Sequence, residues 1–568
     1  MKLATPSGFR DILTEEASER ERITRAVQDL FAKHGFSPIE TPTLEVMDVV
    51  RQGARLPSSP FKFFDSRGDL LAMRPDVTLQ VARMCATRFP KDQDPIRLRY
   101  TQRVFRESDE EAQAKPREIT QMGVEVIGDD GAKTDLELIE LMVEALHVSG
   151  VSKITLSLAS VAPLRALLER SGATDAWKHA VLNAYHESNF VELEKLTSLD
   201  DTTGVEAGNI APAYADAIWK LSRIRGAKDA IEAARELTSP LGCAVGLDEL
   251  ASICDALNSA DSCKMLIDFS MVSSFDYYTG IVFEAYSPYL GTSLGSGGRY
   301  DNMLGSYGIE NSAAGFAFCL EQAMAANTAE GERKASDAAD KLRIAVPKGS
   351  LNSQAIECLE EAGLDVGSLD DPGRQLVVST PSADYIIVRP SDAPAFVAYG
   401  AADCGICGRD SLLESRAQVV ELADLKFGGC KFVVAQPKGA QSSIDERYRK
   451  LGSIRVATKY PNITLSHYAK TGVQVDIVKL HGNIELAPLT GMAERIVDIT
   501  ATGTTLREND LEIVEDVLDS TARFFANPCA LRTRSEVIEL ARKLEKGAEG
   551  KHYDPIAGAS GSKDKEGE

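Results

Sequence analysis

The chain has 568 residues, of which 43% are hydrophobic, and it carries a formal net charge of -22 at pH 7. A chain of this length exceeds what one hydrophobic core usually supports, so we expect about two to four domains. The acidic balance argues against a surface that tracks DNA or RNA, and no apolar run is long enough to cross a bilayer. We therefore expect a cytoplasmic protein with no nucleic-acid partner and no membrane association.

The first predicted element is a helix that begins near Thr14, which can cap its first turn, and that ends before Gly35. Its apolar positions follow helical spacing at Ile23, Val27, Leu30 and Phe31. Strands are predicted next over residues 95–100, 118–127, 153–158 and 281–286. Because helices do not separate these strands in a regular βαβ rhythm, we expect an α+β domain over residues 1–326, with an antiparallel sheet flanked by helices.

Two segments of the chain have little to bury. Residues 327–341 are polar, charged and nearly free of large apolar groups, which indicates a linker. Residues 547–568 mix Gly, Ser, Lys, Asp and Glu, so we expect a disordered tail there.

After the predicted linker, strands and helices alternate. A strand over 342–346, a helix over 350–362, a strand over 385–388 and another strand around 402–406 follow in turn. Alternation of this kind indicates parallel sheets with covered faces, and the length suggests two small α/β lobes with a cleft between them. We expect residues 342–435 and 518–546 to form the first lobe and residues 436–517 the second.

The ten cysteines are spread along the chain, which indicates reduced, buried thiols rather than a disulfide framework. Cys404 and Cys407 form the only C-x-x-C pair, and an apolar run surrounds them. With no second pair at zinc spacing, core packing is favoured over metal or redox chemistry. We predict no metal site built by the protein.

The stretch from Ile496 to Arg507 is the strongest functional signal. Three apolar residues around Asp498 indicate a short strand, and a run rich in Thr and Gly follows before a helix. Small residues let backbone amides surround an anion, and Asp498 can accept hydrogen bonds from ribose hydroxyls. The Gly-Lys-Ser/Thr end of a P-loop is absent, so a 5-phosphoribosyl group fits better than a nucleoside triphosphate. The alternative is a strand-to-helix turn whose hydroxyls only cap the helix. The predicted binding residues are Asp498, Thr500, Ala501, Thr502, Gly503, Thr504 and Thr505.

Residues 342–544 resemble the short form of ATP phosphoribosyltransferase through several motifs in matching order. The motifs are AlaValProLysGly at 345–349, ValArgProSerAspAlaPro at 388–394, the GlyAlaAlaAspCysGlyIleCysGlyArgAsp run at 400–410, PheGlyGlyCys at 427–430, ArgValAlaThrLysTyrProAsnIleThr at 455–464, LeuHisGlyAsnIleGluLeuAlaPro at 480–488 and the Asp498 loop. Ser350 departs from the family, which usually has Arg there. The resemblance implies a two-lobed α/β fold like that of periplasmic binding proteins.

Residues 6–326 resemble the catalytic core of histidyl-tRNA synthetase, and more closely the synthetase-like regulatory subunit that accompanies the short transferase. The motifs are ArgProAspValThr at 74–78, TyrThrGlnArgValPheArgGlu at 100–107, GlnMetGlyValGluValIleGly at 121–128, PheAspTyrTyrThr at 275–279 and GlySerGlyGlyArgTyrAsp at 295–301. Ser273 and Gln322 stand where the synthetase has arginines. Neutral side chains there stabilise phosphoryl charge poorly, so aminoacylation should fail.

The two resemblances together imply an enzyme that transfers a phosphoribosyl group from phosphoribosyl pyrophosphate to N1 of ATP, with Mg2+ on the pyrophosphate oxygens. This reaction is the first step of histidine biosynthesis. The implied catalytic residues are Arg389, Arg374 and Lys348, each of which could instead be an ordinary surface cation. Glu485 is a weaker assignment for orienting the nucleotide or Mg2+, and His481 is left without a role.

The synthetase-like half retains residues that surround histidine in the synthetase, which implies a feedback site. They are Asp76, Thr78, Gln121, Glu125 and Tyr277. Their alternative role is to maintain the fold. Two rival functions stay open: a catalytically inactive protein that only senses histidine, and an active histidine-tRNA ligase, which Ser273 and Gln322 oppose. The related two-subunit systems imply a homo-oligomer for the fused chain.

Overall fold

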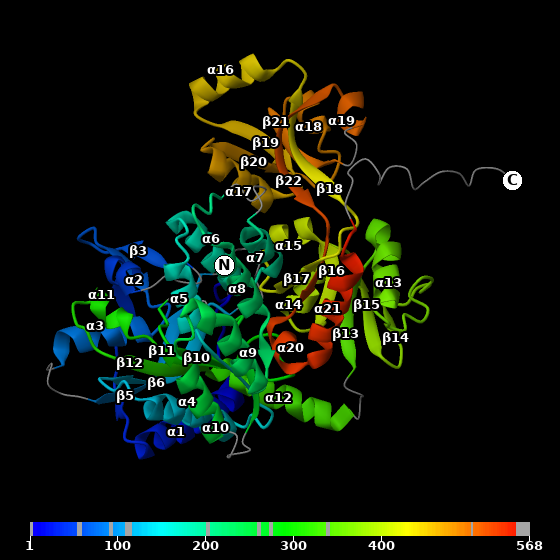
Figure 1. Cartoon of the computed structure of the whole chain (residues 1–568). Helices are drawn as coiled ribbons and strands as arrows, with labels where there is room; N and C mark the ends of the chain where they lie inside the picture. The colour runs from blue at the N-terminus through cyan, green and yellow to red at the C-terminus, as the bar shows by residue number, and fades with distance from the viewer. Residues whose placement is uncertain are drawn as a thin grey trace. The chain divides into compact units, whose positions relative to one another are not determined.

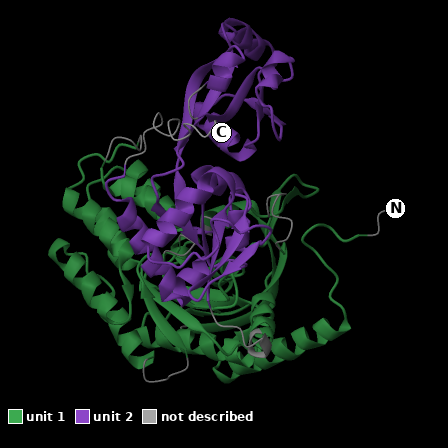
Figure 2. Ribbon diagram, turned by 90° about the vertical axis from the view of Figure 1, so that its right-hand side faces the viewer, with its two compact units in different colours: residues 1–339 green, residues 340–568 purple. Residues whose placement is uncertain are grey.

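A computed structural model describes residues 4–53, 59–89, 95–107, 116–199, 205–257, 263–271, 277–336, 341–500 and 504–551. The chain divides into two compact units, residues 1–339 and residues 340–568 (Figures 1 and 2). The predicted tail beyond residue 551 lies outside the described residues.

Unit 1 is built on a nine-stranded sheet with the strand order β1-β5-β6-β12-β11-β10-β7-β9-β8, and a separate three-stranded sheet has the order β2-β4-β3. The strands are β1 Ser37–Pro38, β2 Leu44–Val46, β3 Lys62–Phe64, β4 Leu70–Met73, β5 Ile96–Phe105, β6 Glu118–Ile127, β7 Thr155–Ser160, β8 Arg225–Gly226, β9 Lys264–Asp268, β10 Ile281–Tyr286, β11 Gly295–Arg299 and β12 Ala313–Cys319. The helices are α1 Thr14–Lys33, α2 Met47–Gly53, α3 Thr78–Arg88, α4 Ala132–Val148, α5 Ala162–Arg170, α6 Asp175–His186, α7 Phe190–Thr197, α8 Pro212–Arg223, α9 Asp229–Thr238, α10 Leu247–Leu257, α11 Asn302–Ser306 and α12 Leu320–Ser336.

The nine-stranded sheet is antiparallel at its centre, from β5 through β7, as the sequence predicts. It is mixed at its edges, because β1 runs parallel to β5 and β9 runs parallel to β7. The central strands are buried on both faces, since helices pack on the sheet. The central strands of unit 1 therefore provide a rigid frame for polar side chains.

The first helix, α1, buries the four apolar residues that its spacing predicts, and Gly35 follows it with a left-handed φ of 81°. Thr14 does not cap this helix. It is the first helical residue, and the capping position is taken by Leu13, which makes no side-chain cap.

The predicted linker is wrong over residues 327–336, because α12 continues to Ser336. Its Ala, Glu, Lys and Arg are strong helix formers, so a polar composition alone does not indicate a loop. Glu330 is 3% exposed and accepts hydrogen bonds from the amides of Ser152 and Lys153, which holds the helix against unit 1.

Unit 2 contains a six-stranded sheet with the order β14-β15-β13-β16-β23-β17 and a five-stranded sheet with the order β20-β19-β21-β18-β22. The strands are β13 Leu342–Pro347, β14 Val377–Ser379, β15 Ala383–Val388, β16 Cys404–Gly408, β17 Val420–Asp424, β18 Cys430–Pro437, β19 Ile454–Thr458, β20 Val475–Lys479, β21 Arg495–Thr500, β22 Leu511–Ser520 and β23 Ala522–Ala526. The helices are α13 Asn352–Glu361, α14 Ala393–Ala398, α15 Arg409–Ser415, α16 Gln441–Leu451, α17 Pro461–Thr471, α18 Leu486–Leu489, α19 Thr504–Glu508, α20 Pro528–Thr533 and α21 Ser535–Ala548.

Both sheets of unit 2 are mixed: β15, β13 and β16 are parallel in the six-stranded sheet, β20, β19 and β21 are parallel in the five-stranded sheet, and the remaining strands pair antiparallel. The predicted parallel strands are therefore present within mixed sheets. The boundary drawn at residue 436 falls inside β18, which pairs along its whole length with β22 of the five-stranded sheet. The chain crosses between the sheets twice, from β17 to β18 and from β22 to β23.

Several contacts join the six-stranded and five-stranded parts of unit 2, among them hydrogen bonds made by Glu414 and Asp410. The carboxylate of Glu414 in α15 accepts hydrogen bonds from the amides of Asn462 and Ile463, at 3.2 and 3.1 Å, and so satisfies the first turn of α17. Ser520, at the second crossing, donates a 3.0 Å hydrogen bond to Asp410.

Cys404 and Cys407 lie buried on β16, in line with the predicted core role. Burial raises the pKa of both thiols well above the usual value. Within the described ranges, no helix is both long and apolar enough to cross a membrane.

Candidate functional site

Unit 1 contains a cavity of about 150 Å³, and all five residues predicted to bind histidine line it: Asp76, Thr78, Gln121, Glu125 and Tyr277. Strand β6 contributes Gln121 and Glu125, while Thr78 begins α3 and Asp76 comes just before it. A cavity of this size can hold a ring of six atoms. The structure thus brings together residues that lie about 200 positions apart in the sequence.

Glu125 lies at the centre of a hydrogen-bonded cluster and is 1% exposed. Its carboxyl group accepts hydrogen bonds from the hydroxyls of Thr78 at 2.7 Å, Tyr100 at 3.1 Å and Tyr300 at 2.6 Å. Burial raises the pKa of Glu125 to about 8, although these hydrogen bonds lower it. Gly315 pairs with Glu125 across β12 and β6, and a Cβ there would collide with the carboxyl group.

Asp76 is 2% exposed and has one unsatisfied oxygen. Its Oδ1 accepts a 2.8 Å hydrogen bond from Gln121, whereas Oδ2 has no partner among the described residues. Burial raises the pKa of Asp76, and the hydrogen bond from Gln121 and the nearby Arg106 partly offset this. A buried oxygen without a donor marks a place for a cationic or hydrogen-bond-donating ligand.

Several lining residues were not predicted. Arg106 and Glu284 contribute charge to the cavity, and Tyr278, whose ring centroid lies 4.7 Å from that of Tyr277, contributes an aromatic face. Tyr100 and Tyr300 hold Glu125. Arg106, Tyr278, Tyr100 and Tyr300 fall inside motifs that the sequence analysis quotes, and only Glu284 does not. The motifs therefore contain these residues, but only the pairing of the strands brings them to one place.

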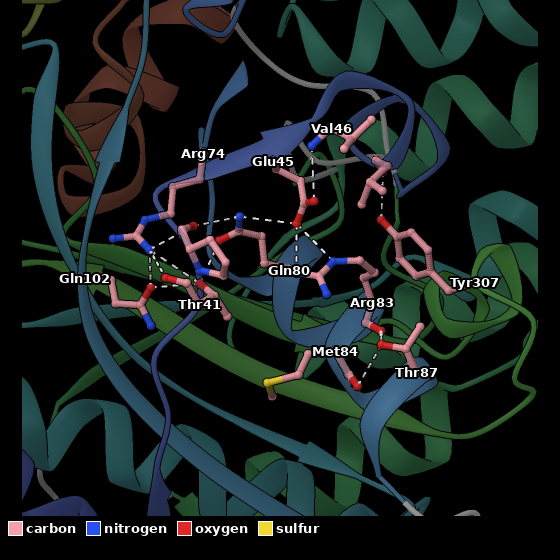
Figure 3. Close-up of polar contacts among 12 residues, drawn as sticks. Thr41, Glu45, Val46, Arg74, Gln80, Arg83, Met84, Thr87, Gln102 and Tyr307 are labelled. Carbon is pink, nitrogen blue, oxygen red and sulfur yellow. Dashed lines mark hydrogen bonds and ion pairs between the residues drawn. The ribbon is translucent and has the colours of Figure 1, made fainter. Parts of the chain in front are cut away.

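A buried polar network fixes the chain that leads into Asp76 (Figure 3). The guanidinium group of Arg74 donates to the backbone oxygens of Thr41 at 2.7 Å and Arg103 at 2.6 Å, and to the side chain of Gln102. Thr41 lies 2.7 Å from the Oε1 atom of Gln80 in α3. Since α3 also carries Thr78, this network positions one side of the cavity.

The structure describes only one of the two residues, Ser273 and Gln322, that stand where the synthetase has arginines. Ser273 lies outside the described residues, as do residues 275–276 of the same motif. Gln322, in the first turn of α12, lines the cavity.

In unit 2, the three predicted catalytic cations lie at one edge of the six-stranded sheet. Pro347 pairs with Val388 in parallel strands, and the amide of Lys348 donates a 2.8 Å hydrogen bond to Val388, so Lys348 and Arg389 leave adjacent strand ends. The antiparallel register of β14 and β15 brings Arg374 toward the same edge. All three side chains are exposed, and none forms a hydrogen bond or ion pair with another described residue.

At the five-stranded sheet, Asp498 and Thr500 lie at the carboxyl end of β21. Burial raises the pKa of Asp498; the carboxylate of Glu485 adds to this rise, and the ammonium group of Lys459 opposes it. The charge of Glu485 therefore acts on the carboxyl group of Asp498. Lys459 was not predicted; it follows β19, whose register with β21 puts it beside Asp498.

Three residues of the predicted phosphate loop, Ala501, Thr502 and Gly503, lie outside the described residues. Thr504 and Thr505 are exposed at the start of α19, which is the helix expected after the loop. The ring of Tyr460 packs edge-on against that of Phe432, with centroids 4.9 Å apart, and burial, together with the charges of Asp410 and Asp498, raises the pKa of its phenol. The described residues form no direct contact between Asp498 and the Arg389 edge.

The described residues contain no group of three or more metal-ligating side chains. Mg2+ is usually held by one or two carboxylates together with substrate phosphates, so Asp498 and Glu485 fit a Mg2+ ion that arrives with a pyrophosphate.

Comparisons with known proteins match the two units to different families. The histidyl-tRNA synthetase family matches residues 8–323, and the ATP phosphoribosyltransferase family matches residues 389–546. ATP phosphoribosyltransferase from Rubrobacter xylanophilus is 46% identical over 197 residues, which are 35% of this chain and 91% of that protein. The one from Moorella thermoacetica is 44% identical over 220 residues, 38% of this chain and 96% of that protein. A crystal structure from Bacillus halodurans of an ATP phosphoribosyltransferase regulatory subunit/histidyl-tRNA synthetase is 27% identical, with a TM-score of 0.52, and covers 68% of this chain and 99% of that chain.

Proposed function

This chain belongs to the histidyl-tRNA synthetase family in unit 1 and to the ATP phosphoribosyltransferase family in unit 2. From that premise we propose which residues take part in the transfer and which bind the inhibitor. The chain is an ATP phosphoribosyltransferase joined to a synthetase-like regulatory unit. In our proposal, unit 2 transfers the phosphoribosyl group to N1 of ATP and releases pyrophosphate, and unit 1 binds histidine as the feedback inhibitor.

The transfer builds positive charge on the sugar and negative charge on the departing pyrophosphate. Lys348, Arg389 and Arg374 converge on one sheet edge without a neutralising partner among the described residues, so their charge is available to the pyrophosphate. Cations held near a charge that develops in the transition state supply much of an enzyme's rate enhancement. The three residues stabilise the leaving group.

Asp498 orients the other side of the substrate. Its carboxylate accepts hydrogen bonds from the ribose hydroxyls, and the amides and hydroxyls that follow β21 hold the 5-phosphate. The attacking N1 of adenine carries no proton at neutral pH, so the reaction needs positioning rather than a general base. Glu485 helps to orient the nucleotide, and His481, which is exposed, has no role in this scheme.

Mg2+ travels with phosphoribosyl pyrophosphate in this proposal. When bound, it neutralises charge on the pyrophosphate oxygens. Asp498 and Glu485 are the carboxylates that would hold it, in keeping with the preference of this ion for substrate phosphates and few protein ligands.

The cavity of unit 1 suits an amino acid with a basic side chain. Its titratable lining consists of three carboxyl groups, Asp76, Glu125 and Glu284, and one guanidinium, Arg106, and Glu125, whose pKa is raised to about 8, is mostly protonated at neutral pH. The free Oδ2 of Asp76 can accept from an α-ammonium group, Arg106 can donate to a carboxylate, and Glu125 can bind an imidazole. Histidine offers all three groups. The unsatisfied oxygen of Asp76 is the observation that carries the proposal of a retained ligand.

One assay tests the proposal against its two rivals. Purified protein is incubated with ATP, phosphoribosyl pyrophosphate and Mg2+, and pyrophosphate release is followed with and without histidine. Release that needs both substrates and falls when histidine is added supports the proposal. No release at all would indicate a histidine sensor without catalytic activity, and release that needs only histidine and ATP would indicate a ligase.

Fusion also bears on assembly. Covalent linkage keeps the two halves at equal stoichiometry and raises the effective concentration of each near the other. We propose a homo-oligomer whose copies each contain one transferase and one regulatory unit.

A further inference from the structure

Gln322 joins two segments that line the cavity of unit 1. With the amide oriented so that its nitrogen faces the backbone, the nitrogen donates to the backbone oxygens of Ser293 at 2.8 Å and Leu294 at 3.3 Å, and the amide oxygen accepts from the hydroxyl of Thr292 at 3.3 Å; in the opposite orientation only the contact with Thr292 is made. These hydrogen bonds determine the orientation of the amide group. Gln322 therefore fastens the first turn of α12 to the segment that connects β10 with β11.

The fastened segment runs from the surface into the cavity lining, which includes Ser293 and Leu294 but not Thr292. Thr292 is exposed, and Ser293 and Gln322 are half-buried, whereas Asp76 and Glu125 are 2% and 1% exposed. Leu294 is fixed separately, because its amide donates to Ala285 and its oxygen accepts from Cys319. What Gln322 adds is restraint on the two residues before Leu294, of which Ser293 lines the cavity.

A ligand enclosed by a folded chain leaves when the segments around it open. The free energy of such a local opening depends on the hydrogen bonds that must break. We propose that Gln322 is a positioning residue that holds the Thr292–Leu294 segment closed over the cavity and thereby slows the release of the bound amino acid. This inference rests on the proposed function, since it takes histidine as the occupant.

The test compares histidine release from the complete protein and its variants. Bound radiolabelled histidine is chased with an excess of unlabelled histidine, and the dissociation rate is measured. Gln322→Glu and Gln322→Met keep nearly the same size but lose both donated hydrogen bonds. We expect each to release histidine about ten times faster, because two neutral hydrogen bonds together are worth about one tenfold factor or more.

The matched control is Glu321→Gln, which changes the same helical turn. Glu321 accepts hydrogen bonds from Thr120 and Arg20 and is not part of the cavity lining. The Glu321→Gln variant should therefore release histidine at the wild-type rate. The thermal unfolding transition of the complete protein and its circular dichroism should be unchanged in both Gln322 variants. This second measurement shows that unit 1 still folds.

The outcomes separate this inference from the function on which it rests. If the wild type binds histidine but Gln322→Glu and Gln322→Met release it within twofold of the wild-type rate, Gln322 does not control release, and the histidine site stands. If Glu321→Gln speeds release equally, the effect belongs to the helical turn and the inference is also wrong. If the wild type binds no histidine, the proposed occupant itself is overturned.

Discussion

Gln121 donates a 2.8 Å hydrogen bond to Oδ1 of Asp76, and the second oxygen of the same carboxylate has no partner among the described residues. One half of the carboxylate is thus fixed by the protein while the other half is left for a ligand. A buried acceptor without a donor costs about 1–3 kcal/mol, so the arrangement favours a bound cation.

Asp76→Asn should weaken histidine inhibition of the transferase by about ten- to hundredfold, because a hydrogen bond to a charged group contributes about 1.5–3 kcal/mol. The half-inhibitory histidine concentration measures this, and the rate without histidine should not change. Asp175→Asn, at a side chain that is 91% exposed, is the control. Equal inhibition of Asp76→Asn and wild type would exclude Asp76 from the histidine site.

Glu125 should make the stability of the ligand-free protein depend on pH. Its pKa is about 8 in the folded chain, against about 4.3 in an unfolded one, so between these values the folded state holds a proton that the unfolded state has lost. The free energy of unfolding should therefore fall as pH rises through this window, by at most about 1.4 kcal/mol per unit from this group.

Glu125→Gln cannot ionise, so its unfolding free energy should fall less steeply with pH. Denaturant unfolding of both proteins at several pH values between 5 and about 9 gives the difference directly. Carboxyl groups that do not interact with Glu125 contribute equally to both proteins and cancel, whereas Asp76, whose charge acts on Glu125, does not. If the unfolding free energies of the two proteins fall equally with pH, Glu125 is already ionised between these pH values. That result would contradict a pKa raised by burial.

Much of this architecture was predictable because local pattern and tertiary role agree. The helical spacing of α1 and the strand β6, found over the predicted residues 118–127, are examples. The helix α12 was missed because its polar residues gave no apolar stripe, and Glu330 is fixed by residues nearly 180 positions away. The partners of Glu125 were also missed because they are distant in sequence. Tyr300 reaches Glu125 only after β6, β12 and β11 have paired.

The predicted catalytic cations of unit 2 could be named from motifs, but their convergence on one edge could not be predicted. The parallel pairing of Pro347 with Val388 is what puts Lys348 and Arg389 on one edge. Lys459 lies inside the motif at 455–464 but was given no role, because only the register of β19 with β21 puts it beside Asp498. The roles of all these residues stay predictions.

Arg389→Met should lower kcat/KM by about 10²–10³, since removal of one donor aimed at developing charge has an effect of that order. Lys348→Met should act similarly. Arg389→Lys should recover little activity, because an ammonium group does not reproduce the two-pronged geometry of a guanidinium. Initial rates of pyrophosphate release provide the measurement.

The control is Arg449→Met, at an exposed arginine on α16 that lies outside both predicted edges. It should retain wild-type kinetics. Should Arg389→Met and Arg449→Met behave alike, Arg389 would be an ordinary surface cation, as the sequence alone allowed.

Asp498→Asn should raise the KM for phosphoribosyl pyrophosphate about tenfold or more and leave the KM for ATP close to the wild-type value. The carboxylate binds ribose hydroxyls through charge-assisted hydrogen bonds, which an amide makes more weakly. Glu485→Gln should have a smaller effect. Asp476→Asn, at an exposed residue of β20 in the same sheet, tests whether the loss of any carboxylate in this sheet raises the KM for phosphoribosyl pyrophosphate. An equal rise in both KM values would place Asp498 at a position shared by the two substrates.

Arg74→Met tests whether the buried network of Figure 3 holds the histidine cavity in shape. Arg74 is 7% exposed, and its loss would leave the backbone oxygens of Thr41 and Arg103 without their donor. Each unsatisfied buried group costs about 1–3 kcal/mol, so the unfolding transition of unit 1 should shift to lower temperature. Histidine inhibition should weaken as well, although Arg74 does not line the cavity.

Arg88→Met, at an exposed residue near the end of α3, should change neither property. The two effects of Arg74→Met distinguish two roles for the network. A lower unfolding temperature with unchanged histidine inhibition would mean that the network only stabilises unit 1. A loss of inhibition at temperatures where the variant is fully folded would mean that Arg74 also positions Asp76, two residues farther along the chain, because the fold survives and only the ligand-binding geometry has changed.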